Sequence, residues 1–317
     1  MKWAIRDTRA LCQVLELPEN TDIGAAATKQ FPVFVPLPFL QRIQRKNFDD
    51  PLLRQVLPIS AEDETRPGFT VDPLEESAAT LTPGLLQKYK SRVLMVTTGA
   101  CAIHCRYCFR RNFPYSDSPG SMEQWLPAIE KIKSAAEINE VILSGGDPLT
   151  LVDERLISLI DAIQAIPHIK RIRFHTRLPI MIPQRITDDL IDRLQRYHGQ
   201  TIFVIHSNHA NEIDDAVASS LVKLKSAGVT LLNQSVLLRG VNNDIDSLVN
   251  LSERLVDNGV LPYYLHQLDR VTGVAHFEVP RDRGIELISQ MRARLPGYAV
   301  PRYVKEEPGE PSKSVWA

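Results

Sequence analysis

Short apolar runs alternate with amphipathic segments from residue 92 onward, and this alternation constrains the fold more than any other feature of the chain. A strand followed by a helix, repeated, is typical of a parallel sheet with helices on its outside. Six repeats predict an α/β protein with a partial (β/α)6 TIM-like barrel. The expected strands cover residues 92–98, 140–145, 171–176, 201–206, 229–237 and 262–267, and a last extended run covers 298–304. The expected helices cover residues 122–136, 153–166, 185–197, 212–227, 245–258 and 283–295.

Polar side chains collect where these strands end. In barrels of this kind the chemistry lies at the carboxyl ends of the strands, because those ends meet on one side of the barrel. The sequence therefore predicts a functional site built from several strand ends. The candidate positions are Cys101 onward, 145–147, 175–177, 206–209, 233–234 and 266–269.

The first 90 residues have a different character. A helical apolar rhythm at 3–17 is followed by stretches that prolines interrupt, such as FPVFVPLPFL, and proline caps short helices and breaks strands. We predict an N-terminal, mostly helical subdomain at 1–90, the barrel at 91–297, and a C-terminal strand and loop at 298–317.

Charge and hydropathy exclude several classes of partner. The formal net charge is -1, so no overall field attracts nucleic acid or an anionic membrane. No apolar run is long enough to span a bilayer, and the N-terminal residues lack the apolar stretch of a secretory signal. We therefore expect a cytoplasmic protein with neither nucleic acid nor membrane as a partner.

Three of the four cysteines lie within eight residues, in the segment GACAIHCRYCFRRNF. A disulfide framework spreads its cysteines along the chain, so this grouping indicates a metal in a reducing compartment. Thiolates at Cys101, Cys105 and Cys108 suit three irons of a [4Fe–4S] cluster and leave the fourth iron open. The alternative is a zinc site that adds His104, although zinc sites more often pair two ligand clusters across a longer gap. Cys12 stands alone.

The segment ILSGGDPL follows the second expected strand, about forty residues after the cysteines. Gly145 and Gly146 have no Cβ and permit a close approach of the backbone to a ligand. The alternative is an ordinary turn at Gly146, Asp147 and the following proline. The position at a strand end favours a cofactor contact that includes Asp147.

The cysteine spacing and the glycine turn resemble those of the radical S-adenosylmethionine (radical SAM) superfamily, and longer strings resemble its lysine 2,3-aminomutases. The matching strings include DPLLRQVLP, RVLMVTTGACAIHCRYCFRR, RLPIMIPQRIT, HSNHANEI, NQSVLLRGVNN and GYAVPRYV, and together they cover about residues 50–313. The resemblance implies a radical SAM barrel that uses a [4Fe–4S] cluster, S-adenosylmethionine and pyridoxal 5'-phosphate (PLP). The glycine turn would lie against the methionine part of S-adenosylmethionine.

The chain looks most like a short bacterial branch of this family, which supplies β-lysine for the modification of elongation factor P. The implied partners are L-lysine, an electron donor of the flavodoxin or ferredoxin type, and a pathway link to elongation factor P and its lysyl-ligating enzyme. A homo-oligomer is also expected. Longer family members carry extra cysteines for a structural zinc, whereas this chain has only Cys12 left over.

The resemblance also implies roles for single residues. Lys313 matches the catalytic lysine that carries PLP, although Gly309-Glu310-Pro311-Ser312 replaces the family's run of glycines before it. Arg110 matches the arginine that binds the substrate carboxylate. Asp269 and Glu306 match the acidic pair that holds the ε-ammonium of lysine, with glutamate at 306 in place of aspartate. Without the resemblance, Lys313 would pass for an ordinary solvated lysine.

Further positions carry less specific patterns. Arg177 in HTRLPI is expected to contact the phosphate of PLP, or else to form a salt bridge beside a helix. Lys88 lies where the family has a phosphate-binding arginine, and lysine can neutralise phosphate as a point charge. His206, His209 and Gln234 lie at strand ends, where they would touch S-adenosylmethionine or serve as core and rim residues.

Other functions fit parts of the same pattern. A catabolic lysine or arginine aminomutase shares every motif, whereas a glutamate enzyme is disfavoured because Asp269 and Glu306 would repel its side chain. A radical lyase without PLP, of the spore photoproduct lyase type, would need the cysteines but not Lys313. A zinc- or cluster-bearing regulatory protein would need the cysteines alone.

Overall fold

The structure of the protein is a computed structural model that describes residues 3–113 and 118–317. Its centre is one ten-stranded sheet in which the strands lie in chain order, β1 to β10. Strands β3 to β9 run parallel, while β1, β2 and β10 are antiparallel to their neighbours. The strands are β1 Thr80–Thr82, β2 Leu85–Tyr89, β3 Arg92–Val96, β4 Glu140–Ser144, β5 Arg171–Thr176, β6 Gln200–His206, β7 Thr230–Val236, β8 Leu261–His266, β9 Arg302–Lys305 and β10 Ser314–Val315.

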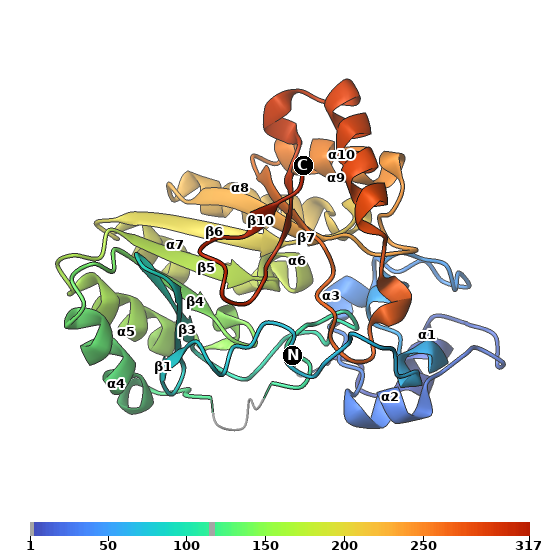
Figure 1. Ribbon diagram of the computed structural model, residues 1–317, viewed down its shortest axis with the longest axis horizontal. Coiled ribbons are helices and arrows are strands. Elements are labelled where there is room, and N and C mark those ends of the chain that lie inside the picture. The colour runs from blue at the N-terminus through green and yellow to red at the C-terminus, as the bar shows by residue number, and fades with distance from the viewer. Residues whose placement is uncertain (1–2, 114–117) are drawn as a thin grey trace.

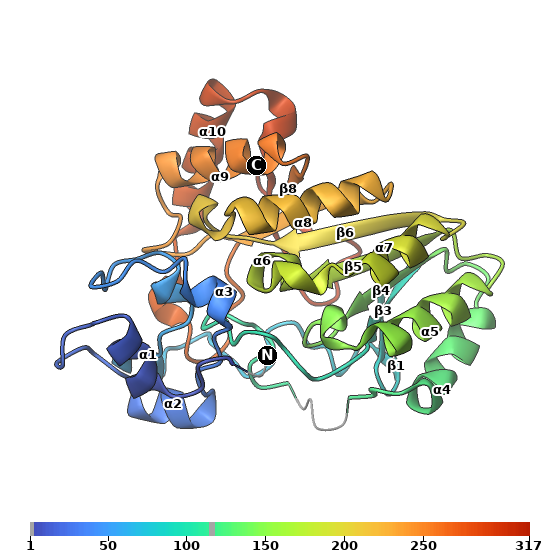
Figure 2. The same ribbon diagram turned by 180° about the vertical axis from the view of Figure 1, so that it is seen from behind.

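Each of the six expected strand–helix units is present, which confirms the α/β radical SAM partial barrel. The crossover helices are α4 Met122–Lys133, α5 Asp153–Gln164, α7 Asp188–Gln195, α8 Asp215–Ser226, α9 Ile245–Asp257 and α10 Arg281–Arg294. Seen from behind, α5, α7 and α8 lie over the outer face of the sheet (Figure 2). They pack there by an apolar stripe at helical spacing, which in α5 consists of Leu156, Leu159, Ile160 and Ile163.

The N-terminal segment contains three short helices, α1 Thr8–Val14, α2 Ala25–Gln30 and α3 Leu37–Leu40, and two 3-10 turns, η1 Leu53–Gln55 and η2 Ser60–Asp63. The expectation of a mostly helical segment up to residue 90 missed the hairpin β1–β2, which extends the main sheet beside β3. Leu11 and Phe39 share one continuous apolar core with Leu143 and Ile172 of the sheet. The N-terminal segment is thus packed into the barrel rather than beside it, and a domain boundary at residue 90 stays a prediction.

The C-terminal strand and loop return to the barrel. Strand β9 pairs with β8, and β10 pairs antiparallel with β9, with Ser314 opposite Lys305. The loop between β9 and β10 lies over the face of the sheet opposite α5, α7 and α8 (Figures 1 and 2). Lys313, the last residue before β10, lies at the end of this loop and pairs with Glu306 at its start.

Among the helices within residues 3–113 and 118–317, none has both the length and the apolar character that a membrane crossing requires.

Candidate active site

The cysteine loop follows β3 and is anchored to the N-terminal segment. Cys101, Cys105 and Cys108 are free thiols, each partly buried. Between them, the guanidinium of Arg106 pairs with the carboxylate of Glu62 in η2 at 2.6 Å, and neither side chain is exposed. A buried pair of this kind is costly to break, so the loop has a fixed position relative to the barrel.

The glycine turn packs directly against this loop. The Gly146 N–H donates to the carbonyl of Thr98, and the Asp147 N–H donates to the carbonyl of Ala100, both at 2.8 Å. A Cβ at Gly146 would lie 2.2 Å from the Ala100 carbonyl oxygen, closer than any real contact. Gly145 has φ of +126°, in a region that residues with side chains avoid. The close approach expected for a ligand is therefore made to the backbone of the cysteine loop, and a contact of either glycine with S-adenosylmethionine stays a prediction.

Asp147 is fully engaged by the protein itself. Its carboxylate accepts hydrogen bonds from the Thr176 hydroxyl at 2.7 Å and from the N–H groups of Arg177 at 2.7 Å and Leu178 at 3.2 Å. Burial raises the pKa of Asp147 to about 6 even though these donors favour the ionised form. The side chain ties the end of β4 to the end of β5, and a contact of Asp147 with a cofactor stays a prediction.

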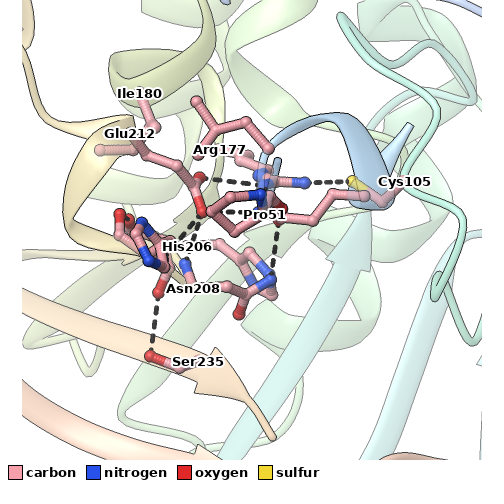
Figure 3. Close-up of polar contacts among 12 residues, drawn as sticks. Pro51, Cys105, Arg177, Ile180, His206, Asn208, Glu212 and Ser235 are labelled. Carbon is pink, nitrogen blue, oxygen red and sulfur yellow. Dashed lines mark hydrogen bonds and ion pairs between the residues drawn. The ribbon is translucent and has the colours of Figure 1, made fainter. Parts of the chain in front are cut away.

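Arg177 lies at the centre of a buried polar network (Figure 3). Its Nη1 donates to the Cys105 Sγ at 2.7 Å, and its Nη2 contacts Gln55 Oε1 at 2.6 Å and Glu212 Oε2 at 2.9 Å. Gln55 Oε1 also accepts from the Asn208 side chain at 3.0 Å. The guanidinium is thus engaged on the cysteine side of the site, and its contact with the PLP phosphate stays a prediction.

His206, at the end of β6, faces the cysteine loop through Tyr107. The Tyr107 hydroxyl and His206 Nε2 are 2.7 Å apart, and the rings stack with centroids 5.6 Å apart. Burial, and then the nearby Arg177 charge, lowers the pKa of His206 well below its ordinary value, so the imidazole is neutral. Gln234 lies opposite His206 in the register of β6 and β7, while His209 accepts the N–H of Asn211 and begins the turn η6 (Ala210–Glu212).

A second group of charges surrounds Lys313. Its ammonium pairs with the carboxylate of Glu306, whose other oxygen accepts from Lys88 Nζ at 2.9 Å. Lys88, on β2, also lies 3.8 Å from Glu76. The structure therefore brings together three of the predicted residues from segments 218 positions apart.

Glu76 carries this chain of charges to Arg110. Both Glu76 oxygens accept from Arg110, from Nε and Nη2, at 2.7 Å each. Arg110 Nη1 reaches the Ser144 hydroxyl at 3.2 Å and the Gly145 carbonyl at 3.4 Å at the end of β4. The arginine predicted to bind a substrate carboxylate thus already holds a carboxylate in the bidentate geometry that guanidinium favours.

The two predicted acids of the ammonium site differ in protonation. Burial, and then the negative charge of Glu306, raises the pKa of Asp269 to about 7. Burial opposes ionisation of Glu306 as well, but the ammonium groups of Lys313 and Lys88 outweigh it and lower the pKa of Glu306 to about 2. Near neutral pH one acid is therefore ionised and the other is half protonated, ready to ionise beside an additional cation.

Known proteins resemble the chain over its whole length. The radical SAM superfamily profile matches residues 95–251. The L-lysine 2,3-aminomutase of Escherichia coli (strain K12) is 47% identical over 300 residues, which cover 95% of this chain and 87% of that protein. The enzyme of the same name from Haemophilus influenzae is 45% identical over 318 residues, covering 100% of this chain and 94% of that protein. The chain belongs to the lysine 2,3-aminomutase family.

More distant proteins show weaker likeness. The L-lysine 2,3-aminomutase of Clostridium subterminale is 35% identical over 319 residues, covering 99% of this chain and 76% of that protein. A solved radical SAM methyltransferase from Sphaerobacter thermophilus has a TM-score of 0.48 and 17% identity over 69% of this chain and 68% of that one.

The cofactors of this aminomutase family are a [4Fe–4S] cluster, S-adenosylmethionine and PLP, and the cysteine loop supplies three free thiols, the type of ligand that such a cluster takes. Burial, and then the neighbouring thiols, raises the pKa of Cys101 and raises that of Cys108 to about 12. Such thiols become thiolates only against a bound cation, which iron provides. Within 3–113 and 118–317, no three Cys, His, Asp or Glu side chains are placed to hold a single metal ion. His104 contacts the Pro32 carbonyl at 2.7 Å and stacks on Phe31, which argues against its part in a zinc site.

The surroundings of Lys313 fit PLP. Lys313 is mostly buried, with 21% of its side chain exposed, and Lys88 and Arg110 supply two further cations for an anionic group. The neutral imidazoles of His175 and His266 lie near Lys313, since its charge helps to lower the pKa of both after burial. Lys313, Lys88 and Arg110 are thus the residues that would hold PLP and its substrate.

Three residues of the site escaped the sequence analysis: Gln55, Glu76 and Glu212. All three are buried polar side chains that pair with predicted residues. Gln55 and Glu76 lie in the proline-interrupted N-terminal segment, where no periodic pattern marks the buried positions. Glu212 is the first residue of an expected helix and the seventh residue of the aminomutase string HSNHANEI, which begins at His206.

Proposed function

We propose that the chain is an isomerase, an L-lysine 2,3-aminomutase that converts L-α-lysine to β-lysine. The identities of 45% and 47% to lysine 2,3-aminomutases over nearly the whole chain support this proposal. The observation that carries it is that one site binds both a carboxylate and an ammonium group. Arg110 binds the carboxylate of Glu76, and Glu306 binds the ammonium of Lys313. Free lysine carries both of these groups.

Lysine would exchange with the two internal partners. Its α-carboxylate would bind to Arg110 in competition with Glu76, because a planar guanidinium accommodates a carboxylate through two hydrogen bonds. Its ε-ammonium would bind between Glu306 and Asp269 in competition with Lys313. The acidic pair repels a side-chain carboxylate, so glutamate is excluded, whereas arginine stays a rival substrate because it is also a cation.

The bound cofactors supply the difficult chemistry, namely radical formation at the cluster with S-adenosylmethionine and transfer of an amino group on PLP. The residues of the chain position the reactants. Arg110 and Glu306 would fix the two ends of lysine, which orients the β-carbon between them. Arg177, buried among Cys105, Gln55 and Glu212, holds the cysteine side in one arrangement and excludes water.

We further propose that the enzyme belongs to the short, EpmB-type branch and provides β-lysine for the modification of elongation factor P by its lysyl-ligating enzyme. A length close to that of the Haemophilus and Escherichia proteins supports this assignment. A flavodoxin- or ferredoxin-type electron donor, a cytoplasmic location and a homo-oligomeric state belong to the same proposal.

An anaerobic assay of the reconstituted enzyme tests the proposal. With S-adenosylmethionine, PLP and a reductant, free L-lysine should yield β-lysine, while arginine and glutamate should react at least about tenfold more slowly because of the match between lysine and its two charge partners. Faster turnover of arginine would make the chain an arginine enzyme. If the enzyme acts on lysine attached to elongation factor P but not on free lysine, the rearrangement follows the attachment of lysine to that protein.

A further inference from the structure

A cavity of about 500 Å³ lies outside the lysine site, beside the carboxyl ends of β8 and β9. This volume is within the range of small-molecule binding sites. The lining comes from the loop after β7, the stretch from the loop after β8 to the start of α10, the end of β9, and the residue that follows β10. The residues are Arg239, Gln267, Leu268, Arg270, Glu278, Val279, Pro280, Arg281, Lys305 and Trp316.

The cavity lies beside the lysine site. Side chains alternate between the two faces along β9. Tyr303 and Lys305 lie on the face of Trp316, whose ring centroid is 5.5 Å from that of Tyr303 and 6.0 Å from Lys305 Nζ. Glu306, the residue that follows β9, pairs with Lys313, and neither of them belongs to the cavity lining. The positive charge of Lys305 acts on Asp269, so the cavity is a close neighbour of the lysine site but has its own lining.

Cationic side chains dominate the lining. Four of them, Arg239, Arg270, Arg281 and Lys305, surround the cavity with a single carboxylate, Glu278. Glu278 is already paired with Arg270 at 2.7 Å. The other three cations form no ion pair within the described ranges of the chain. Like charges that share one concavity without counter-charges raise the local concentration of anions.

Trp316 and the start of α10 hold these charges in place. The Arg281 guanidinium carbon lies over the Trp316 ring at 4.4 Å, a cation–π contact that reduces the freedom of the side chain without removing its charge. Arg281 is also the first residue of α10, a helix of 14 residues whose partly positive N-terminal end therefore faces the same cavity. Leu268, Val279 and Pro280 add an apolar wall.

We propose that this cavity is a second binding site, which takes a small anion that bears phosphate or carboxylate groups. Three unpaired cations and the end of a helix match a group with two or three negative charges. The indole and the apolar wall match a short carbon skeleton attached to it. The site is distinct from that of lysine, because its lining includes Lys305 and Trp316 but neither Glu306 nor Lys313.

Calorimetric titration of the anaerobic holoenzyme, saturated with PLP and lysine, tests the proposal. The probes are inorganic phosphate, adenosine monophosphate and citrate at low salt, and the Arg281→Gln/Lys305→Gln double variant should bind the preferred probe at least about tenfold more weakly. The matched control is Arg292→Gln/Arg302→Gln, which removes two exposed cations from the same helix and the same strand but outside the cavity lining. Tight binding of citrate rather than phosphate would identify a carboxylate ligand, and preference for the nucleotide would identify a phosphate ester.

Three results would overturn the proposal: no heat with any of the three probes, equal affinity in the double variant and the control, or competition between the probe and lysine. Should the double variant not fold, Arg239→Gln removes a third cation of the lining from an exposed position. Tryptophan fluorescence gives a second measurement of binding, because Trp316 lines the cavity whereas Trp125 is fully buried elsewhere and Trp3 is 72% exposed. A fluorescence change on binding that disappears in Trp316→Phe comes from the cavity.

Discussion

The two halves of the active site are built in different ways. On the cysteine side, Arg106 with Glu62 and Arg177 with Glu212 form ion pairs in which no side chain is more than 7% exposed. On the lysine side, the ion pairs of Glu306 join it to Lys88 and Lys313, whose side chains are 22% and 21% exposed.

This difference separates a fixed half from an exchangeable half. Breaking a buried pair leaves an uncompensated charge in a dry interior, which costs several kcal/mol, whereas partly exposed pairs of long side chains contribute little and form again easily. The cysteine side must keep one geometry throughout the reaction. The lysine side must release its internal partners each time a substrate enters, and the following predictions test this contrast.

The largest effect is expected at the cysteines. Cys105→Ala should lose the iron and sulfide of a [4Fe–4S] cluster and all cleavage of S-adenosylmethionine, because three thiolates are needed for three irons. Cys12→Ala should keep both, since Cys12 lies in α1, outside the loop. Iron and sulfide analysis with a cleavage assay measures the outcome. Normal iron content in Cys105→Ala would show that the cluster is held elsewhere.

Lys313→Ala should abolish rearrangement of lysine but leave the fixed half intact. We expect unchanged iron content and slow cleavage of S-adenosylmethionine, because Lys313 contacts Glu306 and not the cysteine loop. Borohydride should no longer attach PLP to the chain, and peptide mapping checks this directly. Trapping of PLP on Lys88 or Lys305 in the variant would assign the cofactor lysine differently.

Glu212→Gln tests the fixed half by its stability. Removing the charge leaves Arg177 buried without its ion-pair partner, at a cost of about 3–5 kcal/mol. The melting temperature should fall by on the order of 10 °C. Glu130→Gln is the control, because its pair with Lys133 is long, at 3.7 Å, and more than half exposed, so little change is expected. Equal melting temperatures of the two variants would contradict a fixed cysteine side.

Glu76→Gln tests a pair of the lysine side that is as buried as the pairs of the cysteine side, since the side chains of Arg110 and Glu76 are only 7% and 6% exposed. An amide offers Arg110 one uncharged acceptor in place of two carboxylate oxygens, so residue 76 competes less strongly with the substrate carboxylate for Arg110, and the KM for lysine should fall about tenfold. The kcat and the iron content should change little. Glu75→Gln, at the exposed neighbouring position, is the control. A fall in kcat with unchanged KM would mean that Glu76 acts on the reaction and not on substrate binding.

The sequence predicted the motifs of the cysteine side better than it predicted which residues pair with the long cationic side chains. The cysteine loop and the glycine turn are local motifs at strand ends, so spacing and periodicity locate them. The partners of the long cations are not local: Arg177 reaches Gln55 across 122 positions, and Lys88 reaches Glu306 across 218. Such pairs depend on how the N-terminal segment folds over the sheet, which the pattern of a single chain does not encode.

The same reason explains the missed hairpin at the N-terminal edge. Strands β1 and β2 have three and five residues and lack a long alternation of polar and apolar positions. Their extended form depends on pairing with β3, which is a tertiary contact. The six barrel strands were predictable because each is followed by an amphipathic helix of eight or more residues.

The smallest expected effect is the dependence of lysine binding on pH. It should come from Asp269, a buried acid of the lysine side with a raised pKa. The raised pKa of about 7 means that Asp269 is ionised above neutral pH and protonated below it. The ε-ammonium of lysine stays charged throughout this range, so substrate binding should weaken as the pH falls. We expect the KM for lysine to rise by at most about tenfold from pH 8 to pH 6, because each unit of pH below the pKa costs at most a factor of ten.

The Asp269→Asn variant separates this effect from other titrations. It should bind lysine more weakly, by roughly 2–5 kcal/mol, and its KM should change little with pH between about 6 and 8. Glu306 does not contribute to the profile in this window, because its pKa of about 2 keeps it ionised. If the wild-type profile survives in Asp269→Asn, the titrating group is another one and the cation lies elsewhere. A third outcome is a wild-type KM that does not change with pH together with a loss of affinity in Asp269→Asn. In that case Asp269 binds the ammonium but stays ionised down to pH 6, so the lysine side is more polar than the burial of Asp269 indicates.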